Sequence, residues 1–519
     1  MRAKSPRARA ALAALLLAAA SGAAPVSNAQ SPPGAVSPSR GTLLQRRPEL
    51  ITTIAAPVLL LELGSLANAQ VLTLGGNVRC AVAVHRIQYA TVGAAGEATT
   101  ASGALMVPVG LDRRCRGPRP VLLYAHGTSP DRDFNIADLR VQKNPEGMFM
   151  AAFAAMGYIV AAPNYAGYDS STLGYHPYLV ADQQSKDMID ALAAARSALP
   201  VAAAPITTSN NGRLFITGYS QGGYVAMATH RAMQALGMTV TASAPMSGPY
   251  ALAAFGDAIF AGRVNSGSTV TSVLLTNAYQ RAYGRIYSTA DEIFESQYAS
   301  GIESLLPTSV PRSALYAQGR LPADALFSLS PPDAVFADIT PATVPAALAP
   351  VFANGFGRDN LIRNSYRLRY LRDAELSPDG GWPTTLDGAP PAAPALELRK
   401  ALRRNDLRNW IPTAPILLCG GRADPVVFWS NTLLMAGYWA PRAPATARIS
   451  VLDVDSAATD GDPYASIKER FARAKQFVAY SAVVQGATDG GARAVAEVYH
   501  APLVAPFCLA AVDSFFAEQ

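Results

Sequence analysis

The clearest chemical signal in the 519-residue chain lies in Arg213–Gly223, which reads RLFITGYSQGG. An apolar run leads directly into the motif GYSQG around Ser220, and a helical pattern follows it. A serine between a strand and a helix is typical of a sharp turn that exposes its hydroxyl group, and the small residues Gly218 and Gly222 let such a turn pack against a neighbouring strand. The helix N-terminus also favours developing negative charge. The pattern predicts Ser220 as a nucleophile.

A serine hydroxyl is a weak nucleophile until a base accepts its proton, so the five histidines of the chain are the next candidates. Behind a strand–turn–helix serine, the partners follow in the order Asp or Glu, then His. Three histidines precede the serine and therefore fail this test, namely His85, His126 and His176. His230 fails it because it lies in the predicted helix that directly follows Ser220. The remaining one, His500, is the predicted base.

The acid that orients the base should follow the next buried strand. Pro415–Cys419 is such a strand, and Asp424 comes after it across a glycine-rich exit. This arrangement places a carboxylate at the carboxyl edge of a sheet, so Asp424 is the predicted acid. Asp453 and Asp455, which end the following strand, are the alternative, and we expect them to cap a turn.

A tetrahedral intermediate needs two backbone N–H donors. The residue after the nucleophile, Gln221, supplies one of them. The loop after the strand Pro120–Ala125 begins His126-Gly127-Thr128, and we expect the N–H of Thr128 to be the second donor. Gly127 lets the backbone approach the oxyanion, and His126 is predicted to hold the loop by hydrogen bonds.

The sequence predicts that the elements which position these residues are an antiparallel hairpin followed by a parallel sheet. Cys80–Ala90 and Ala101–Pro108 alternate like hairpin strands around a glycine turn. Apolar strands separated by helical stretches then follow, namely Pro120–Ala125, Tyr158–Ala162, Arg213–Thr217, Val240–Met246, Pro415–Cys419 and Ala447–Val454. Continuous apolar strands alternating with helices indicate a mostly parallel sheet with helices on both faces, an α/β fold.

One block breaks the alternation. Between residues 250 and 411 the chain has Pro and Gly clusters, short helical patterns and no strong strand, so we interpret it as a cap inserted into the sheet domain. The predicted organisation is a leader over 1–29, a linker and helix over 30–79, core over 80–249, cap over 250–411 and core over 412–519. We expect the cap to shape the substrate pocket, with Trp382 and Trp429 contributing large side chains.

The N-terminus predicts export. Residues 1–10 are basic, residues 11–20 are rich in alanine and leucine, and small residues precede Ala29. This is the pattern of a signal peptide over 1–29, with Ala23 as a second cleavage position and an uncleaved anchor as the alternative. A secreted or periplasmic location follows. Behind the leader we expect a Ser/Pro/Gly linker over Ser31–Arg47 and then a helix over Leu50–Leu61.

Charge argues against a nucleic-acid binder. The chain has 43 basic and 37 acidic residues, a net charge of +6, and four of the basic residues fall within the first nine positions. Without those four the net charge is only about +2. A metal centre is also disfavoured, because the chain has no His-Glu-x-x-His motif and its one acidic cluster, Asp453, Asp455, Asp460 and Asp462, lacks calcium-loop spacing.

The four cysteines form an even set, as expected in an oxidising compartment. We predict the pairs Cys80–Cys115 and Cys419–Cys508. The first would close the hairpin, and the second would tie the loop of Asp424 to the segment of His500. Free, buried thiols at the second pair are the alternative.

Together these motifs resemble the secreted α/β-hydrolases of the secretory lipase and esterase kind, including lid-bearing fungal lipases and their bacterial relatives. The matching stretches are Tyr124–Thr128, Ala162–Leu179, Gly218–Gly223, Asn405–Trp410, Leu417–Val427 and His500. The resemblance implies an α/β-hydrolase fold from about Cys80 onward. It also implies hydrolysis of small-molecule or lipid esters by a triad of Ser220, Asp424 and His500, without a cofactor.

Other functions use the same residues, so alternatives stay open from the sequence alone. An acyltransferase or a peptidase could use the same triad, and a non-catalytic binding protein could keep the fold. The acyl chain, transient contact of the cap with a lipid interface, and the oligomeric state are also undetermined at this point.

Overall fold

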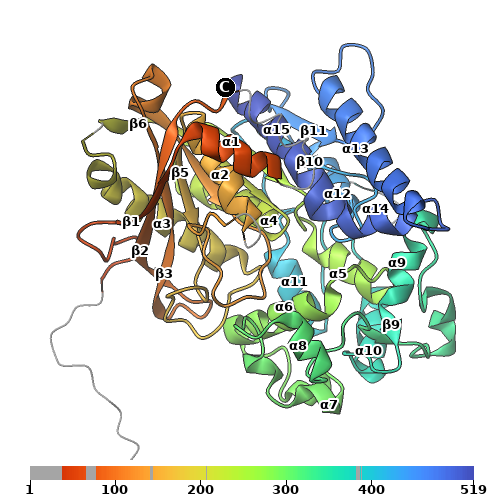
Figure 1. Ribbon diagram of the computed structural model, residues 1–519. Helices are drawn as coiled ribbons and strands as arrows, with labels where there is room; N and C mark the ends of the chain where they lie inside the picture. The colour runs from red at the N-terminus through yellow and green to blue at the C-terminus, as the bar shows by residue number, and fades with distance from the viewer. Residues whose placement is uncertain (1–37, 66–76, 141–143, 206, 381–385, 387) are drawn as a thin grey trace, which may run out of the picture. The chain divides into compact units, whose positions relative to one another are not determined.

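The computed structural model describes residues 38–65, 77–140, 144–205, 207–380, 386 and 388–519. The predicted signal peptide over 1–29 and Trp382 lie outside these residues. A nine-stranded sheet, in the order β1-β2-β3-β5-β4-β6-β7-β10-β11, is the centre of the fold (Figure 1). Its strands are β1 Glu49–Ile54, β2 Ala81–Val92, β3 Ala98–Val109, β4 Gly117–Ala125, β5 Ile159–Pro163, β6 Thr208–Tyr219, β7 Ala242–Met246, β10 Ile416–Gly420 and β11 Ile449–Asp453.

Strands β5, β4, β6, β7, β10 and β11 pair in parallel, whereas β1, β2, β3 and β5 pair antiparallel. Strand β4 shows how the sheet is buried. Val121 and Leu123 join the hydrophobic cluster on one face, and Leu122 and Tyr124 join the cluster on the other face. Because successive side chains point to opposite faces, a strand covered on both sides has to be apolar throughout. The prediction of a mostly parallel sheet with an antiparallel hairpin is confirmed.

Helices cover both faces. On one face lie α3 (Ala181–Ala202), α4 (Gln221–Ala235) and α12 (Ser430–Trp439). On the other lie α1 (Ala56–Ser65), α2 (Pro145–Ala155), α13 (Ala465–Val484), α14 (Ala492–Val498), the π-helix η8 (Tyr499–Val504) and α15 (Ala505–Ala517). The continuous run Ala492–Ala517 is long and apolar enough to cross a membrane by length and composition, but 61% of its most apolar window is buried inside the molecule, as in a core helix.

The N-terminal segment differs from the prediction. We expected a linker as far as Arg47 and a helix over Leu50–Leu61, but β1 occupies Glu49–Ile54 and the helix begins only at Ala56. The N–H of Gly41 also donates to the carbonyl oxygen of Ala90 on β2 at 2.8 Å. The exposed edge of β2 offers unpaired backbone groups, and the β-branched run ITTI suits a strand, so pairing prevails over the helical pattern.

The two predicted disulfides are present, Cys80–Cys115 and Cys419–Cys508. The first joins the start of β2 to the short 3₁₀ helix η3 (Arg113–Cys115), which follows β3. The second joins β10 to α15. It therefore connects the strand that leads to Asp424 with the helix that follows His500.

Between β7 and β10 the chain forms the block expected as a cap. It contains α5 (Leu252–Phe260), α6 (Ser268–Tyr283), α7 (Ser296–Ala299), α8 (Arg312–Ala317), α9 (Ala349–Asn354), α10 (Asn364–Leu376), α11 (Glu397–Asn405), the 3₁₀ helices η4 (Ala290–Glu292), η5 (Ile302–Ser304), η6 (Ala334–Ile339) and η7 (Ala346–Leu348), and the two-residue strands β8 (Phe327–Ser328) and β9 (Phe356–Gly357). In Figure 1 this insertion is the green to cyan part of the chain. Most of its buried apolar residues belong to the same hydrophobic cluster as α3 and α4, so the insertion is packed on the sheet domain.

Two buried ion clusters stabilise the insertion. Arg399 of α11 contacts Asp257 at 2.7 Å and Asp373 at 2.9 Å. Arg408, fully buried behind α11, contacts Asp379 at 2.6 Å and Asp406 at 2.9 Å. Asp406 also accepts from the N–H of Ala253 at 3.0 Å, which joins the end of the insertion to its beginning.

We expect Arg408→Ala to lower the free energy of unfolding by about 3–5 kcal/mol, because it leaves two buried carboxylates without their cation. Thermal unfolding followed by circular dichroism measures this change. Arg372→Ala is the matched control, since Arg372 also contacts two carboxylates but is exposed. Equal melting temperatures for the two variants would show that the buried cluster does not stabilise the insertion.

Candidate active site

Ser220 lies on the sharp turn between β6 and α4. Its backbone has φ 60° and ψ −123°, a strained conformation for a residue with a side chain. The turn also passes very close to β4. A Cβ atom on Gly222 would lie 1.9 Å from the carbonyl oxygen of Ala125, and one on Gly218 would lie 2.5 Å from the same oxygen. Both positions therefore require glycine, as predicted.

Asp424 and His500 are in direct contact. Oδ2 of Asp424 lies 2.7 Å from Nδ1 of His500, while Oδ1 accepts hydrogen bonds from the N–H groups of Val426 at 2.9 Å and Val427 at 3.0 Å. The carboxylate is 1% exposed. A carboxylate at Nδ1 keeps a proton there and leaves the lone pair on Nε2, which is the form that a general base needs.

Nε2 of His500 is buried and has no hydrogen-bond partner among the described residues. It lines the same cavity as Ser220. The bond between Oγ of Ser220 and Nε2 of His500 is therefore not formed in this conformation. Catalytic hydrogen bonds of this kind often close only when substrate is bound.

The backbone around His500 is unusual. His500 is the second residue of the π-helix η8, which contains Pro502. A π-helical turn inserted between two α-helices is often found at functional sites, because it shifts side chains out of the regular helical register. The hydroxyl of Tyr219, next to the nucleophile, donates to the carbonyl oxygen of His500. This bond ties the turn of Ser220 directly to the backbone of His500.

Tyr499 provides a second connection. Its hydroxyl donates to Oδ2 of Asp455 at 2.7 Å and accepts from the N–H of Ala423 at 3.2 Å. Tyr499 precedes His500 and Ala423 precedes Asp424, so one hydroxyl group holds together the two segments that carry the predicted acid and the predicted base.

The alternative acids are engaged elsewhere. Asp453 pairs with Arg422 at 2.5 Å and accepts from its N–H, and Asp455 pairs with Lys475 as well as with Tyr499. Asp462, from the same acidic cluster, pairs with Lys468 at 2.6 Å. Asp453 also accepts from the N–H of Asp455 at 2.9 Å, which is the turn-capping contact that the sequence suggested.

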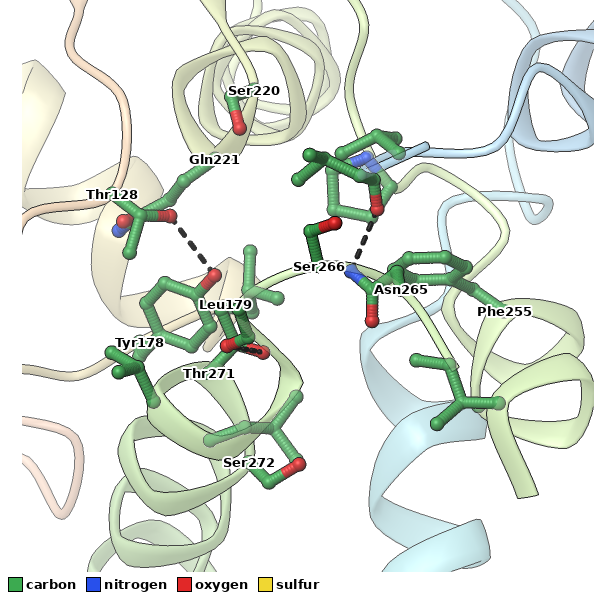
Figure 2. Close-up of a pocket in the computed structure, with 18 of the residues that line it drawn as sticks. Thr128, Tyr178, Leu179, Ser220, Gln221, Phe255, Asn265, Ser266, Thr271 and Ser272 are labelled. Carbon is green, nitrogen blue, oxygen red and sulfur yellow. Dashed lines mark hydrogen bonds between the residues drawn. The ribbon is translucent and has the colours of Figure 1, made fainter. Parts of the chain in front are cut away.

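The predicted oxyanion donors both line the cavity. The N–H of Gln221 is the first of α4, and the first N–H groups of a helix have no acceptor within it. The side chain of Gln221 turns away, with Nε2 lying 2.7 Å from Nε2 of the buried His176. Burial lowers the pKa of His176 to about 3, so its ring is neutral and accepts this bond. Figure 2 shows Gln221, Ser220 and Thr128 at one end of the cavity.

The loop that carries Thr128 is held by aromatic residues. Oγ1 of Thr128 lies 3.0 Å from the hydroxyl of Tyr178 (Figure 2). The ring of His126 stacks between Phe134 and Tyr165, with centroid distances of 4.2 and 4.1 Å. Burial lowers the pKa of His126 to about 4. This geometry supports the predicted structural role of His126.

The remaining two histidines lie away from Ser220. His85 is a residue of β2. Nδ1 of His230 lies 2.8 Å from Oγ of Ser243, and its ring packs edge-on against Trp410.

A cavity of about 330 Å³ extends from the serine into the insertion. Its apolar wall includes Leu252, Phe255, Ile259, Phe260, Leu326, Ile362, Leu398 and Leu402, and its polar wall includes Asn265, Ser266, Thr271 and Ser272. Figure 2 shows Phe255 and Asn265 across the cavity from Thr128. Trp429, expected to contribute, does not line the cavity, because its ring packs over Gly420 instead.

Sequence reasoning missed three groups at this site. Glu146 lines the cavity, Tyr219 holds the carbonyl group of His500, and Tyr499 joins the acid and base segments. Tyr219 and Tyr499 stand next to predicted residues, so their positions in the chain were a usable signal. Glu146 had no such signal, since it belongs to a separate helix.

We expect Tyr499→Phe to lower kcat by about 10-fold, because losing a buried hydrogen bond costs about 1–3 kcal/mol and loosens the contact between acid and base. Ester hydrolysis kinetics measure the change, and melting temperatures show whether the fold is retained. Tyr480→Phe, which removes an exposed hydroxyl group, is the control. An unchanged kcat in Tyr499→Phe would contradict the positioning role.

Comparisons with solved structures support the interpretation of this site as that of an ester hydrolase, although comparisons at the sequence level find no match. No family model matches the chain. No curated protein matches it by sequence. Among solved structures, one of the rice cell wall degrading esterase LipA from Xanthomonas oryzae is 27% identical, covers 84% of this chain and 95% of its own, and has a TM-score of 0.62. A second structure of that esterase is 25% identical to this chain and has a TM-score of 0.64. The match covers 93% of this chain and 100% of the esterase chain.

A structure from Legionella pneumophila shares the fold at 20% identity, covering 79% of this chain and 91% of its own with a TM-score of 0.57. The sheet order, the serine turn and the esterase similarity together define the class of this protein. It is a lipase/esterase-like α/β-hydrolase, a carboxylic ester hydrolase.

Proposed function

We propose that this protein is an exported serine esterase that forms an acyl-enzyme on Ser220, with His500 as the base and Asp424 as the orienting acid. One observation carries the proposal. A single cavity contains a strained serine turn and a histidine whose Nδ1 is bound to a buried carboxylate and whose Nε2 is unpartnered among the described residues.

The proposed reaction follows from this arrangement. Oγ of Ser220 attacks the ester carbonyl carbon while Nε2 of His500 takes its proton, and the carbonyl oxygen becomes an oxyanion. The N–H groups of Gln221 and Thr128 stabilise that oxyanion. His500 then protonates the leaving alcohol. Water, deprotonated by His500, attacks the acyl-enzyme and releases the acid and the free serine.

A fluorophosphonate probe tests the nucleophile. We expect it to label the wild-type protein on Ser220 and to leave Ser220→Ala unlabelled, with kcat for an ester lower by about 10⁴- to 10⁶-fold. Peptide mapping by mass spectrometry locates the label. Labelling of equal extent in Ser220→Ala would contradict the assignment.

The acyl group is proposed to occupy the insertion. The part of the cavity beyond Ser220 is lined mainly by aliphatic and phenyl side chains, which suit a hydrocarbon chain. The apolar lining favours an ester with an alkyl acyl group over a peptide substrate.

Filling this part of the cavity should shorten the preferred acyl chain. We expect Ile259→Trp to lower kcat/KM for p-nitrophenyl dodecanoate by about 10-fold or more while leaving the acetate ester within about twofold, because only the long chain competes with the added ring. Val335→Trp, at an exposed position of the same insertion, is the control. Equal losses on both esters would argue against acyl binding in the insertion.

Export is the remaining part of the proposal. The basic and apolar leader supports it, and so do the two disulfides, which persist in oxidising compartments. Sequencing the N-terminus of the protein recovered from the culture medium or periplasm tests it, with Gln30 expected as the first residue.

A further inference from the structure

A carboxyl group lies at the reactive end of the cavity without a place in the proposed triad. Glu146, the second residue of α2, lines the cavity together with Gly127, Thr128, Ser220 and His500. An acidic group beside an oxyanion site needs an explanation, because a negative charge there opposes the charge that develops during the reaction.

The contacts of Glu146 point to the loop after β4. Its two carboxyl oxygens lie 3.2 and 3.1 Å from the N–H of Gly127, and its Oε2 accepts from the hydroxyl of Tyr124 at 2.7 Å. Tyr124 belongs to β4 and Gly127 to the loop that follows it. One side chain from α2 thus joins the end of the strand to the first part of the loop.

Gly127 needs such a restraint. A Cβ atom at this position would lie 3.0 Å from Oε1 of Glu146, so the close contact favours glycine. Glycine, however, has the least restricted backbone of all residues. The direction of the next N–H group, that of Thr128, depends on the backbone angles of Gly127. Contacts from outside the loop therefore have to fix those angles.

His126 supplies the second restraint. Its Nδ1 lies 2.7 Å from the carbonyl oxygen of Gly127. That carbonyl and the N–H of Thr128 belong to one planar peptide group and point in opposite directions. With the N–H of Gly127 held by Glu146 and its carbonyl oxygen held next to His126, the N–H of Thr128 has a defined direction.

We infer that Glu146 is a positioning residue that aims the backbone N–H of Thr128 at the oxyanion. The inference rests on the proposed function, because Thr128 is a donor only if Ser220 is the nucleophile. Burial also raises the pKa of the Glu146 carboxyl group, which favours its neutral form beside the reacting atoms. In either protonation state the carboxyl group of Glu146 keeps an oxygen that accepts from the N–H of Gly127.

The test compares Glu146→Ala with Glu146→Gln. The alanine variant removes the acceptor for Gly127, and we expect kcat to fall by about 10- to 100-fold with KM within about twofold, since a displaced donor affects the transition state. Glutamine keeps an acceptor oxygen and a donor, so we expect it to restore kcat to within about threefold of wild type. A boronic acid inhibitor, which mimics the tetrahedral state, should lose affinity in Glu146→Ala in parallel with kcat/KM.

A closely matched control exists in the same chain. Glu97 accepts from the hydroxyl of Tyr175 at 2.6 Å and from the N–H of Ala95 at 2.9 Å, the same pair of contacts in the turn between β2 and β3. Glu97 does not line the cavity. Glu97→Ala should therefore leave kcat, KM and boronate affinity unchanged.

The outcomes separate the two proposals. If the fluorophosphonate fails to label Ser220 in the wild type, the proposed function fails. If wild type is labelled but Glu146→Ala keeps its kcat, or Glu146→Gln loses as much as Glu146→Ala, the positioning role is wrong. If Glu146→Ala does not fold, Glu146→Asp decides, because its carboxyl group is one methylene too short to reach Gly127. A wild-type kcat in that variant overturns the inference.

Discussion

The hydrogen bond between Asp424 and His500 is the contact on which the site depends. Its partners are 76 residues apart in the chain, and both lie outside regular strands. Their separation is therefore fixed by other bonds between the same two segments. The disulfide Cys419–Cys508 links the strand before Asp424 to the helix after His500. The hydroxyl of Tyr499, the residue before His500, bonds to Ala423, the residue before Asp424, and to Asp455. Because the contact is buried, its geometry is shielded from water and its charge is not screened by solvent.

Ser220, the proposed nucleophile, is placed by a different constraint. The turn of Ser220 fits only because Gly218 and Gly222 allow it to touch β4, and β4 itself leads into the loop of Thr128. The strand pair β4–β6 therefore positions both Ser220 and the loop that carries Thr128, the proposed oxyanion donor. Glu146 of α2 connects a third element to this unit, since its carboxyl group accepts from the N–H of Gly127 in that loop. The serine, the proposed donors and the proposed base thus come from three separate segments that line one cavity, and Glu146 comes from a fourth.

The insertion completes the site by closing the cavity. Its helices share one hydrophobic cluster with α3 and α4, and buried ion pairs of Arg399 and Arg408 join its beginning to its end. A block fixed in this way supplies a preformed wall for the proposed acyl site. Apolar residues of the insertion form that wall. Trp429 does not contribute to it, because its ring packs over Gly420 of β10.

The sequence by itself determined the features that depend on local pattern. Apolar strands alternating with helices indicated the sheet, and the order of motifs indicated Ser220, Asp424 and His500, because strand burial and a tight turn both leave a signature in neighbouring residues. Tertiary structure alone decided the rest. Glu49–Ile54 became a strand because the open edge of β2 lies beside it. Glu146 reaches Gly127 because α2 packs on the sheet face from which Leu122 and Tyr124 of β4 project. Such contacts depend on residues distant in the chain, so a local pattern such as the β-branched run ITTI can favour a strand but cannot specify its partner.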